Sequence, residues 1–151
     1  MIAQNSSKDL EGLLVVTVEQ AVAAPYTSCR LADAGARVIK IERPEGDFAR
    51  NYDSNALGNS AYFVWLNRGK ESIALDLKNK EDMAIFENII SKSDILIQNL
   101  APGAFERLGL DLKELRIKYP SLSRASIAGF GDEGPYKNQK AYDMLIQAET
   151  G

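Results

Sequence analysis

The chain has 151 residues, 45% of them apolar, which is enough for about one domain with a modest core. Eighteen basic and 21 acidic side chains give a net charge of −3, so charge gives no reason to expect binding to nucleic acid or to an anionic membrane. Histidine is absent and Cys29 is the single cysteine, which excludes histidine-based triads, histidine-ligated metals, internal disulfides and cysteine-rich zinc sites within these residues.

The chain begins with a polar extension that is followed by a strand and a helix. Residues 1–9 carry both charge signs and contain no apolar stretch after a basic segment, so we expect no leader peptide and a cytoplasmic protein. Leu13–Val18 is almost continuously apolar, which predicts a strand buried on both faces. Pro25–Ala34 predicts a helix, because proline suits a first turn and Gly35 follows the end.

Strands and helices continue to alternate along the chain. Helices are expected after Asn79 and after Asp111, whose side chains are good N-caps, and again over Ala141–Gly151. Because that last pattern stops without a closing tail, we expect the chain to be a fragment. The alternation predicts an α/β fold, a Rossmann-like, doubly wound and largely parallel sheet with ligands at the carboxyl ends of its strands. The further strands are predicted at Val38–Ile41, Ile73–Leu77, Ile95–Ile97 and Leu122–Ala128.

A glycine-rich segment, Gly129–Gly134, matches the spacing of a dinucleotide-binding fingerprint. The fingerprint opens a helix directly, whereas Pro135 and further loop residues separate this segment from the next helix. Asp132 and Glu133 would also place negative charge beside the phosphates. We therefore interpret the segment as a mobile loop. The first strand–helix junction contains no glycine, which argues against a standard NAD(P)-binding fold.

Cationic side chains follow several predicted strands. Arg43 stands just after the second strand, where its guanidinium would suit a phosphate-bearing ribose; an exposed surface arginine is the alternative. Arg50, Arg68 and Lys70 lie in predicted loops, and Arg107 follows the loop after the fourth strand. Taken singly, each is a surface residue by default. Their distribution over several such loops favours a site.

Five motifs occur in a specific order along the chain. They are Ala24–Pro25, Gly35–Pro44, Asn67–Ile73, Asn99–Gly103, and Gly129–Pro135 with Ala141–Asp143. Together they resemble the N-terminal part of the family III CoA-transferases, also called the CaiB/BaiF family. The resemblance extends from about Leu10 to Gly151. Each motif is weak alone, but the order and spacing of the five are specific.

The resemblance implies a Rossmann-like large domain and transfer of CoA between carboxylic acids through aspartyl-CoA anhydride and thioester intermediates. It implies acyl-CoA and small acids, including dicarboxylates such as succinate, as substrates, with no metal and no tightly bound cofactor. Two full-length chains would interlock as a homodimer. We expect no nucleic-acid or membrane partner.

The resemblance also assigns roles to individual residues. Val22 and Ala23 would line the acyl-transfer pocket, and Arg43 would meet the adenosine 3′-phosphate region. Tyr142 and Asp143 would lie near the thioester end. Contacts with the nucleotide and its phosphates are implied for Lys70, Asn99, Leu100, Arg107 and Lys140.

Two departures and one absence qualify the resemblance. Val22 stands where some members have glutamine, which suggests a different acyl substrate or a different geometry of the intermediate. Tyr142 stands where the racemase branch has histidine, which favours a transferase. The nucleophilic aspartate and the smaller domain are expected beyond Gly151, so residues 10–151 would form a CoA-binding part that is inactive alone. The alternatives are a non-catalytic CoA or adenine-nucleotide module, a product that does not fold stably, and a nicotinamide oxidoreductase. For the last of these, the sequence lacks the glycines of the dinucleotide-binding turn.

Overall fold

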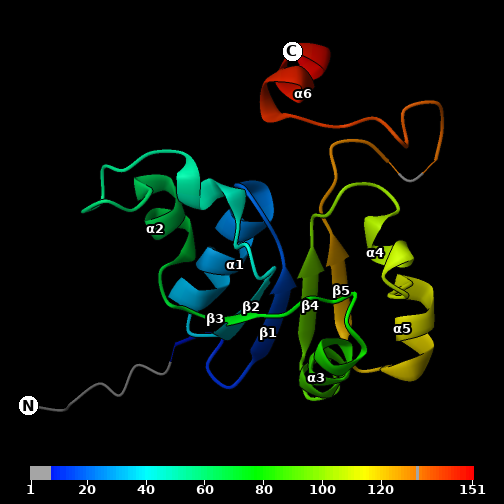
Figure 1. The fold of residues 1–151 in the computed structure, drawn as a ribbon. Coiled ribbons are helices and arrows are strands. Elements are labelled where there is room, and N and C mark those ends of the chain that lie inside the picture. Colours follow the sequence, from blue (N-terminus) through cyan, green and yellow to red (C-terminus); the bar gives the residue numbers. More distant parts are fainter. Residues whose placement is uncertain (1–7, 132) are drawn as a thin grey trace, which may run out of the picture.

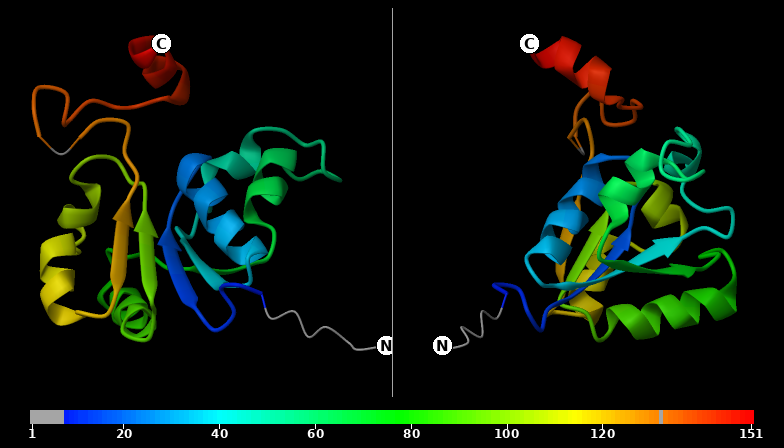
Figure 2. Two further views of the ribbon diagram at one scale, coloured as in Figure 1. Left: turned by 180° about the vertical axis from the view of Figure 1, so that it is seen from behind. Right: turned by 90° about the vertical axis from the view of Figure 1, so that its left-hand side faces the viewer.

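The structure, a computed structural model, describes residues 8–131 and 133–151. Within those residues, five strands form one all-parallel sheet in the order β3-β2-β1-β4-β5, as Figures 1 and 2 show. The strand order reverses between β1 and β4, which is the switch point of a Rossmann-like sheet. The predicted doubly wound α/β fold is confirmed. The strands are β1 (Leu14–Val18), β2 (Arg37–Glu42), β3 (Lys70–Ala74), β4 (Ile95–Gln98) and β5 (Ser123–Ser126).

Helices cover both faces of the sheet. On one face α1 (Ala23–Asp33) packs on the strands, and α2 (Ala61–Asn67) contacts α1. The opposite face carries α3 (Lys80–Ile90), α4 (Ala104–Arg107) and α5 (Leu112–Lys118). A short 3₁₀ helix, η1 (Phe48–Asn51), follows β2, and α6 (Asp143–Thr150), red in Figure 1, lies beyond the carboxyl ends of the strands. Among the described residues, no helix has the length and apolar composition that crossing a bilayer requires.

Two apolar cores lie on the two faces of β1. Val15 packs with Ala24 and Val38 beneath α1, while Val16 and Val18 belong to the core on the opposite face. Successive side chains of a strand point to opposite faces, so covering both faces requires apolar residues at consecutive positions. This explains the continuous apolar run that identified the strand from the sequence.

The predicted helix boundaries rest on side-chain caps that the structure contains. Asn79 accepts hydrogen bonds from the backbone N–H groups of Glu81 and Asp82, and Asp111 accepts one from Lys113. These contacts satisfy N–H groups that a helix N-terminus leaves without partners. Gly35, with φ of 105°, ends α1 in the left-handed region, as its position predicted.

Other boundaries differ from the sequence-based prediction. β3 begins at Lys70 rather than Ile73, because Val38 of β2 pairs with Lys70 in the sheet register. Leu75 and Leu77, which the prediction placed in this strand, are core residues that follow it. Helix α2 was not predicted because its apolar residues do not all lie on one buried face: Leu66 is buried, whereas Tyr62, Val64 and Trp65 are each about half exposed.

The glycine-rich segment after β5 does not open a helix, since α6 begins only at Asp143. That separation agrees with the interpretation of the segment as a loop. Asp132 within it lies outside the described residues, as do residues 1–7 of the predicted polar extension. A Cβ at Gly129 would overlap Ala141 and crowd Ile146, so glycine permits the returning chain to approach closely there.

Candidate functional site

A crevice lies at the carboxyl ends of the strands, beside the switch point. Two adjoining cavities of about 230 and 780 Å³ form it, between the ends of β1 and β2 and the segment that follows β4. The residues that line both cavities are Val18, Ile41, Glu42, Arg43, Leu100 and Ala104. We call this the switch-point crevice. Open α/β sheets bind their ligands at this position.

Two arginines bring positive charge to the larger cavity of the switch-point crevice. Arg43 follows β2 and Arg107 ends α4, and both line that cavity. Each guanidinium has one long hydrogen bond of 3.5 Å to a backbone carbonyl, from Arg43 to Gly46 and from Arg107 to Pro102. Neither forms an ion pair with a described side chain, so both guanidiniums are available to an anionic ligand.

Asn99 and Leu100, the residues that follow β4, have different surroundings. The Asn99 side chain accepts a hydrogen bond from the Gln20 N–H and donates one to the Gln20 carbonyl, both at 2.9 Å. Asn99 thereby ties the turn between β1 and α1 to the end of β4. Leu100 lines both cavities of the switch-point crevice. The nucleotide contacts expected of both residues remain predictions.

Lys70 lies beneath α1 rather than in an open loop. Its ammonium donates to a Glu19 carboxylate oxygen at 2.7 Å and to the Pro25 carbonyl at 2.9 Å. The side chains of Lys70 and Glu19 are 1% and 0% exposed. Burial lowers the pKa of Lys70, although Glu19 opposes that change. Lys70 is therefore part of a buried ion pair, and its contact with a nucleotide remains a prediction.

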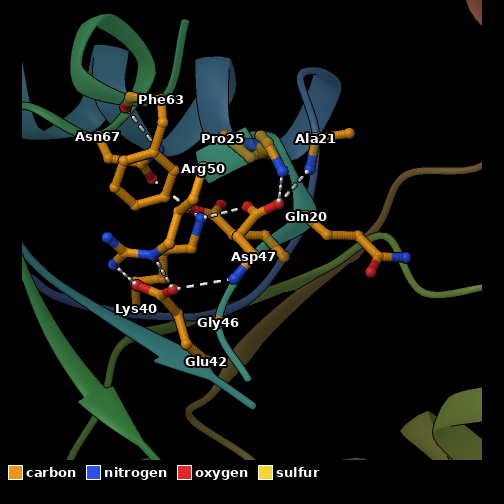
Figure 3. Close-up of polar contacts among 12 residues, drawn as sticks. Gln20, Ala21, Pro25, Lys40, Glu42, Gly46, Asp47, Arg50, Phe63 and Asn67 are labelled. Carbon is orange, nitrogen blue, oxygen red and sulfur yellow. Dashed lines mark hydrogen bonds and ion pairs between the residues drawn. The ribbon is translucent and has the colours of Figure 1, made fainter. Parts of the chain in front are cut away.

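A second buried ion pair joins β2 to the loop that follows it. The Lys40 ammonium donates to Asp47 at 2.7 Å and to the amide oxygen of Asn67 at 3.0 Å, and Figure 3 shows these side chains together. The side chains of Lys40 and Asp47 are each 1% exposed. Sequence reasoning missed both residues. Lys40 lies two positions after Val38, so both side chains point to the face of β2 that α1 covers. That alternation is the sequence signal that could have predicted the burial of Lys40.

Glu42 at the end of β2 forms a two-pronged ion pair with Arg50. The guanidinium donates to the two carboxylate oxygens at 2.8 and 2.9 Å, and the Ser72 hydroxyl donates at 2.7 Å. Arg50 also lies over the ring of Phe63, 3.9 Å from its centroid. Burial would raise the pKa of Glu42, but the hydrogen bonds from Arg50, Ser72 and the Asp47 N–H outweigh it and lower that pKa to about 2.

Three of the cations that the sequence placed in loops form ion pairs in the structure. In the fold, each of Arg50, Arg68 and Lys70 forms an ion pair with a carboxylate from another part of the chain, although Glu71 is the sequence neighbour of Lys70. Glu42, Asp33 and Glu19 are the respective partners. We therefore infer that these three cations stabilise the folded domain.

The remaining residues with predicted roles lie outside both cavity linings. Val22 and Ala23 stand at the start of α1 and are exposed. Lys140, Tyr142 and Asp143 are exposed around the start of α6, where the Asp143 carboxylate accepts a hydrogen bond from Gln147. Their roles remain predictions. Across residues 8–131 and 133–151, no group of three or more acidic or cysteine side chains could hold a metal ion.

A family model decides which family this chain belongs to. The model of CoA-transferase family III matches residues 10–151. The chain belongs to this family. It is 44% identical over 142 residues to the acetyl-CoA:oxalate CoA-transferase of Acetobacter aceti, a match that covers 93% of this chain and 36% of that protein. It is 36% identical over 156 residues to the succinate–glutarate CoA-transferase of Agrobacterium fabrum, covering 97% of this chain and 39% of that protein.

Solved structures agree with this family III assignment. A CaiB/BaiF family protein from Brucella suis matches with a TM-score of 0.87 and 37% identity, over 94% of this chain and 39% of that one. A hypothetical protein from Mycobacterium tuberculosis matches with a TM-score of 0.89 and 33% identity, over 96% and 40% of the two chains. The resemblance identified from the five motifs is confirmed. This family III chain spans about two fifths of the length of these relatives.

Proposed function

We propose that the switch-point crevice binds the nucleotide part of CoA, in a protein that transfers CoA between small carboxylic acids. The observation that carries the proposal is the pair of arginines, Arg43 and Arg107, that line the crevice without a carboxylate partner among the described residues. CoA carries anionic phosphates, and a guanidinium binds phosphate through charge-assisted hydrogen bonds. The relatives are named for oxalate, succinate and glutarate, and these names support dicarboxylates as acyl acceptors or donors.

The residues of this chain would hold and orient the CoA thioester. In the family's reaction a carboxylate attacks the thioester carbon, forms an anhydride and releases CoA as its thiolate. We place that attacking carboxylate outside these 151 residues, not at Asp143. We also propose that the whole protein is a cytoplasmic homodimer. A non-catalytic CoA-binding module is the second candidate, because the same crevice and arginines would serve it.

The 151-residue chain by itself is expected to show no CoA-transferase activity, because we place the group that forms the covalent intermediate outside these residues. The purified chain should be assayed with succinyl-CoA and several acceptor acids, including oxalate and glutarate. Turnover that is lost in Asp143→Asn would contradict both this expectation and the placement of the nucleophile.

Arg43→Ala is expected to weaken binding of CoA far more than binding of dephospho-CoA, which lacks the 3′-phosphate. Losing a charge-assisted contact costs about 1.5–3 kcal/mol, or roughly ten- to more than a hundred-fold in affinity. Calorimetry with both proteins and both ligands measures the four dissociation constants. Their ratios isolate the contribution of the 3′-phosphate.

Arg37→Ala is the matched control for this experiment. Arg37 begins β2, the strand that Arg43 follows, and its guanidinium pairs with Glu71 at the opposite end of the sheet. It should leave both affinities unchanged. Equal losses for CoA and dephospho-CoA in Arg43→Ala would show that Arg43 does not recognise the 3′-phosphate.

A further inference from the structure

The turn between β1 and α1 contains a strained residue. Ala21 has a φ of 63°, in the left-handed region that residues with a Cβ rarely adopt. Helix α1 begins two residues later, and its N-cap residue, Val22, forms no side-chain hydrogen bond to the first turn. A strained backbone persists only where the surrounding structure holds it in place. The contacts of this turn therefore reveal what holds it.

Two side chains hold the turn from opposite sides. Asn99, after β4, bonds both the N–H and the carbonyl of Gln20 at 2.9 Å. Asp47, after β2, accepts a hydrogen bond at 3.2 Å from the N–H of Ala21 itself. Figure 3 shows the Asp47 carboxylate pointing toward the Ala21 backbone. The strained residue is thus bonded directly to a buried carboxylate.

Asp47 is itself fixed by several contacts. One carboxylate oxygen lies 2.7 Å from the Lys40 ammonium, and the other accepts from the N–H groups of Ala21 and Ala49. Its own N–H donates to Glu42. Because the Asp47 side chain is 1% exposed, water cannot replace these partners. The carboxylate therefore has one orientation available to it.

We propose that Asp47 is a positioning residue, which holds the strained Ala21 turn through Oδ1 while Lys40 fixes the carboxylate. Glu19 and Gln20 line the smaller cavity of the switch-point crevice, as Asp47 itself does, so this turn shapes the cavity. The turn also leads directly into α1, which begins at Ala23. The consequence for ligand binding rests on the proposed function. The effect on the turn itself does not.

The test compares two variants in which the buried charges are removed together. Asp47→Ala alone would leave the Lys40 ammonium buried without a counter-ion, which strongly destabilises a folded domain. In Lys40→Met/Asp47→Asn the side-chain oxygen that accepts from Ala21 is kept, whereas in Lys40→Met/Asp47→Ala it is removed. The two variants share the loss of charge and differ at Oδ1. Each is made in the 151-residue chain.

Amide hydrogen exchange is the first measurement. The Ala21 N–H should exchange about tenfold faster, or more, in the alanine variant than in the asparagine variant, because its acceptor is lost. Exchange at Leu96, in the interior strand β4, should be the same in both. Equal exchange at Ala21, or an equal acceleration at Leu96, would overturn the proposal, since the first shows no hold on the turn and the second shows general destabilisation.

Binding of CoA and of dephospho-CoA is the second measurement. When the binding-competent turn is less populated, both affinities should fall by the same factor, about tenfold, in the alanine variant relative to the asparagine variant. Unchanged affinities would overturn the link between Asp47 and the crevice. If the unsubstituted chain binds neither ligand while exchange at Ala21 still differs between the variants, the proposed function fails and the positioning role stands.

Discussion

Replacing Lys70 by methionine is expected to lower the free energy of unfolding by about 3–5 kcal/mol, because the substitution leaves a buried carboxylate without its counter-ion. The Glu19 side chain is 0% exposed, and the Ser28 hydroxyl would remain as a neutral donor to it. A domain of this size is typically stable by only about 5–15 kcal/mol, so this loss is a large fraction of the total. Urea unfolding followed by circular dichroism at pH 7 measures the change.

The double variant Glu19→Gln/Lys70→Met separates the loss of a partner from the value of the pair. Removing both charges leaves no uncompensated ion, and such replacements are often close to neutral. The double variant is therefore expected to recover most of the stability that Lys70→Met loses. An equal loss in the single and double variants would show that the Glu19 charge is not what makes Lys70→Met costly.

The stabilising effect of Glu42 is expected to depend on pH. Its pKa is lowered from 4.5 to about 2 in the folded protein, and a lowered pKa means that the ionised carboxylate favours the folded state. The contribution, about 3 kcal/mol, should be fully present above pH 4.5 and should disappear as the pH falls toward 2. The stability difference between the unsubstituted chain and Glu42→Gln, measured by urea unfolding, should therefore be larger at pH 7 than at pH 3.

Glu71→Gln is the matched control, because Glu71 also pairs with an arginine but at the surface. The side chains of Arg37 and Glu71 are 62% and 56% exposed, and an exposed pair contributes at most about 1 kcal/mol. Its substitution should change stability little at either pH. A pH-independent difference for Glu42→Gln would contradict the linkage.

Pairing with an acid is what distinguishes the cations of this domain from one another. Ion pairs with carboxylates within the domain are formed by Lys40, Arg50 and Lys70. Arg43 and Arg107 line the switch-point crevice without such a partner among the described side chains. An anionic ligand gains most from a cation whose charge is not already neutralised. For this reason the CoA proposal rests on these two arginines.

Local sequence patterns determined much of the fold. Three kinds of feature act through neighbours in the chain or through burial of a whole element. They are the apolar run at the first strand, the caps at Asn79 and Asp111, and Gly35 after the first helix. They predicted the alternating α/β order, and from it the position of Arg43 at the carboxyl end of β2. Five ordered motifs were specific enough to identify the family.

The sequence could not reveal which charges would meet, because that depends on how the strands are ordered. Glu19 and Lys70 are 51 positions apart, and only the order β3-β2-β1 brings them together beneath α1. Asp47 reaches the Ala21 N–H across 26 positions for the same reason. Helical and strand periodicity encode which face of an element is buried, but not which polar side chain on that face finds a partner on another element. Tertiary structure alone decided that Lys70 is a buried ion-pair partner, while Arg43 lines the crevice without a carboxylate partner among the described residues.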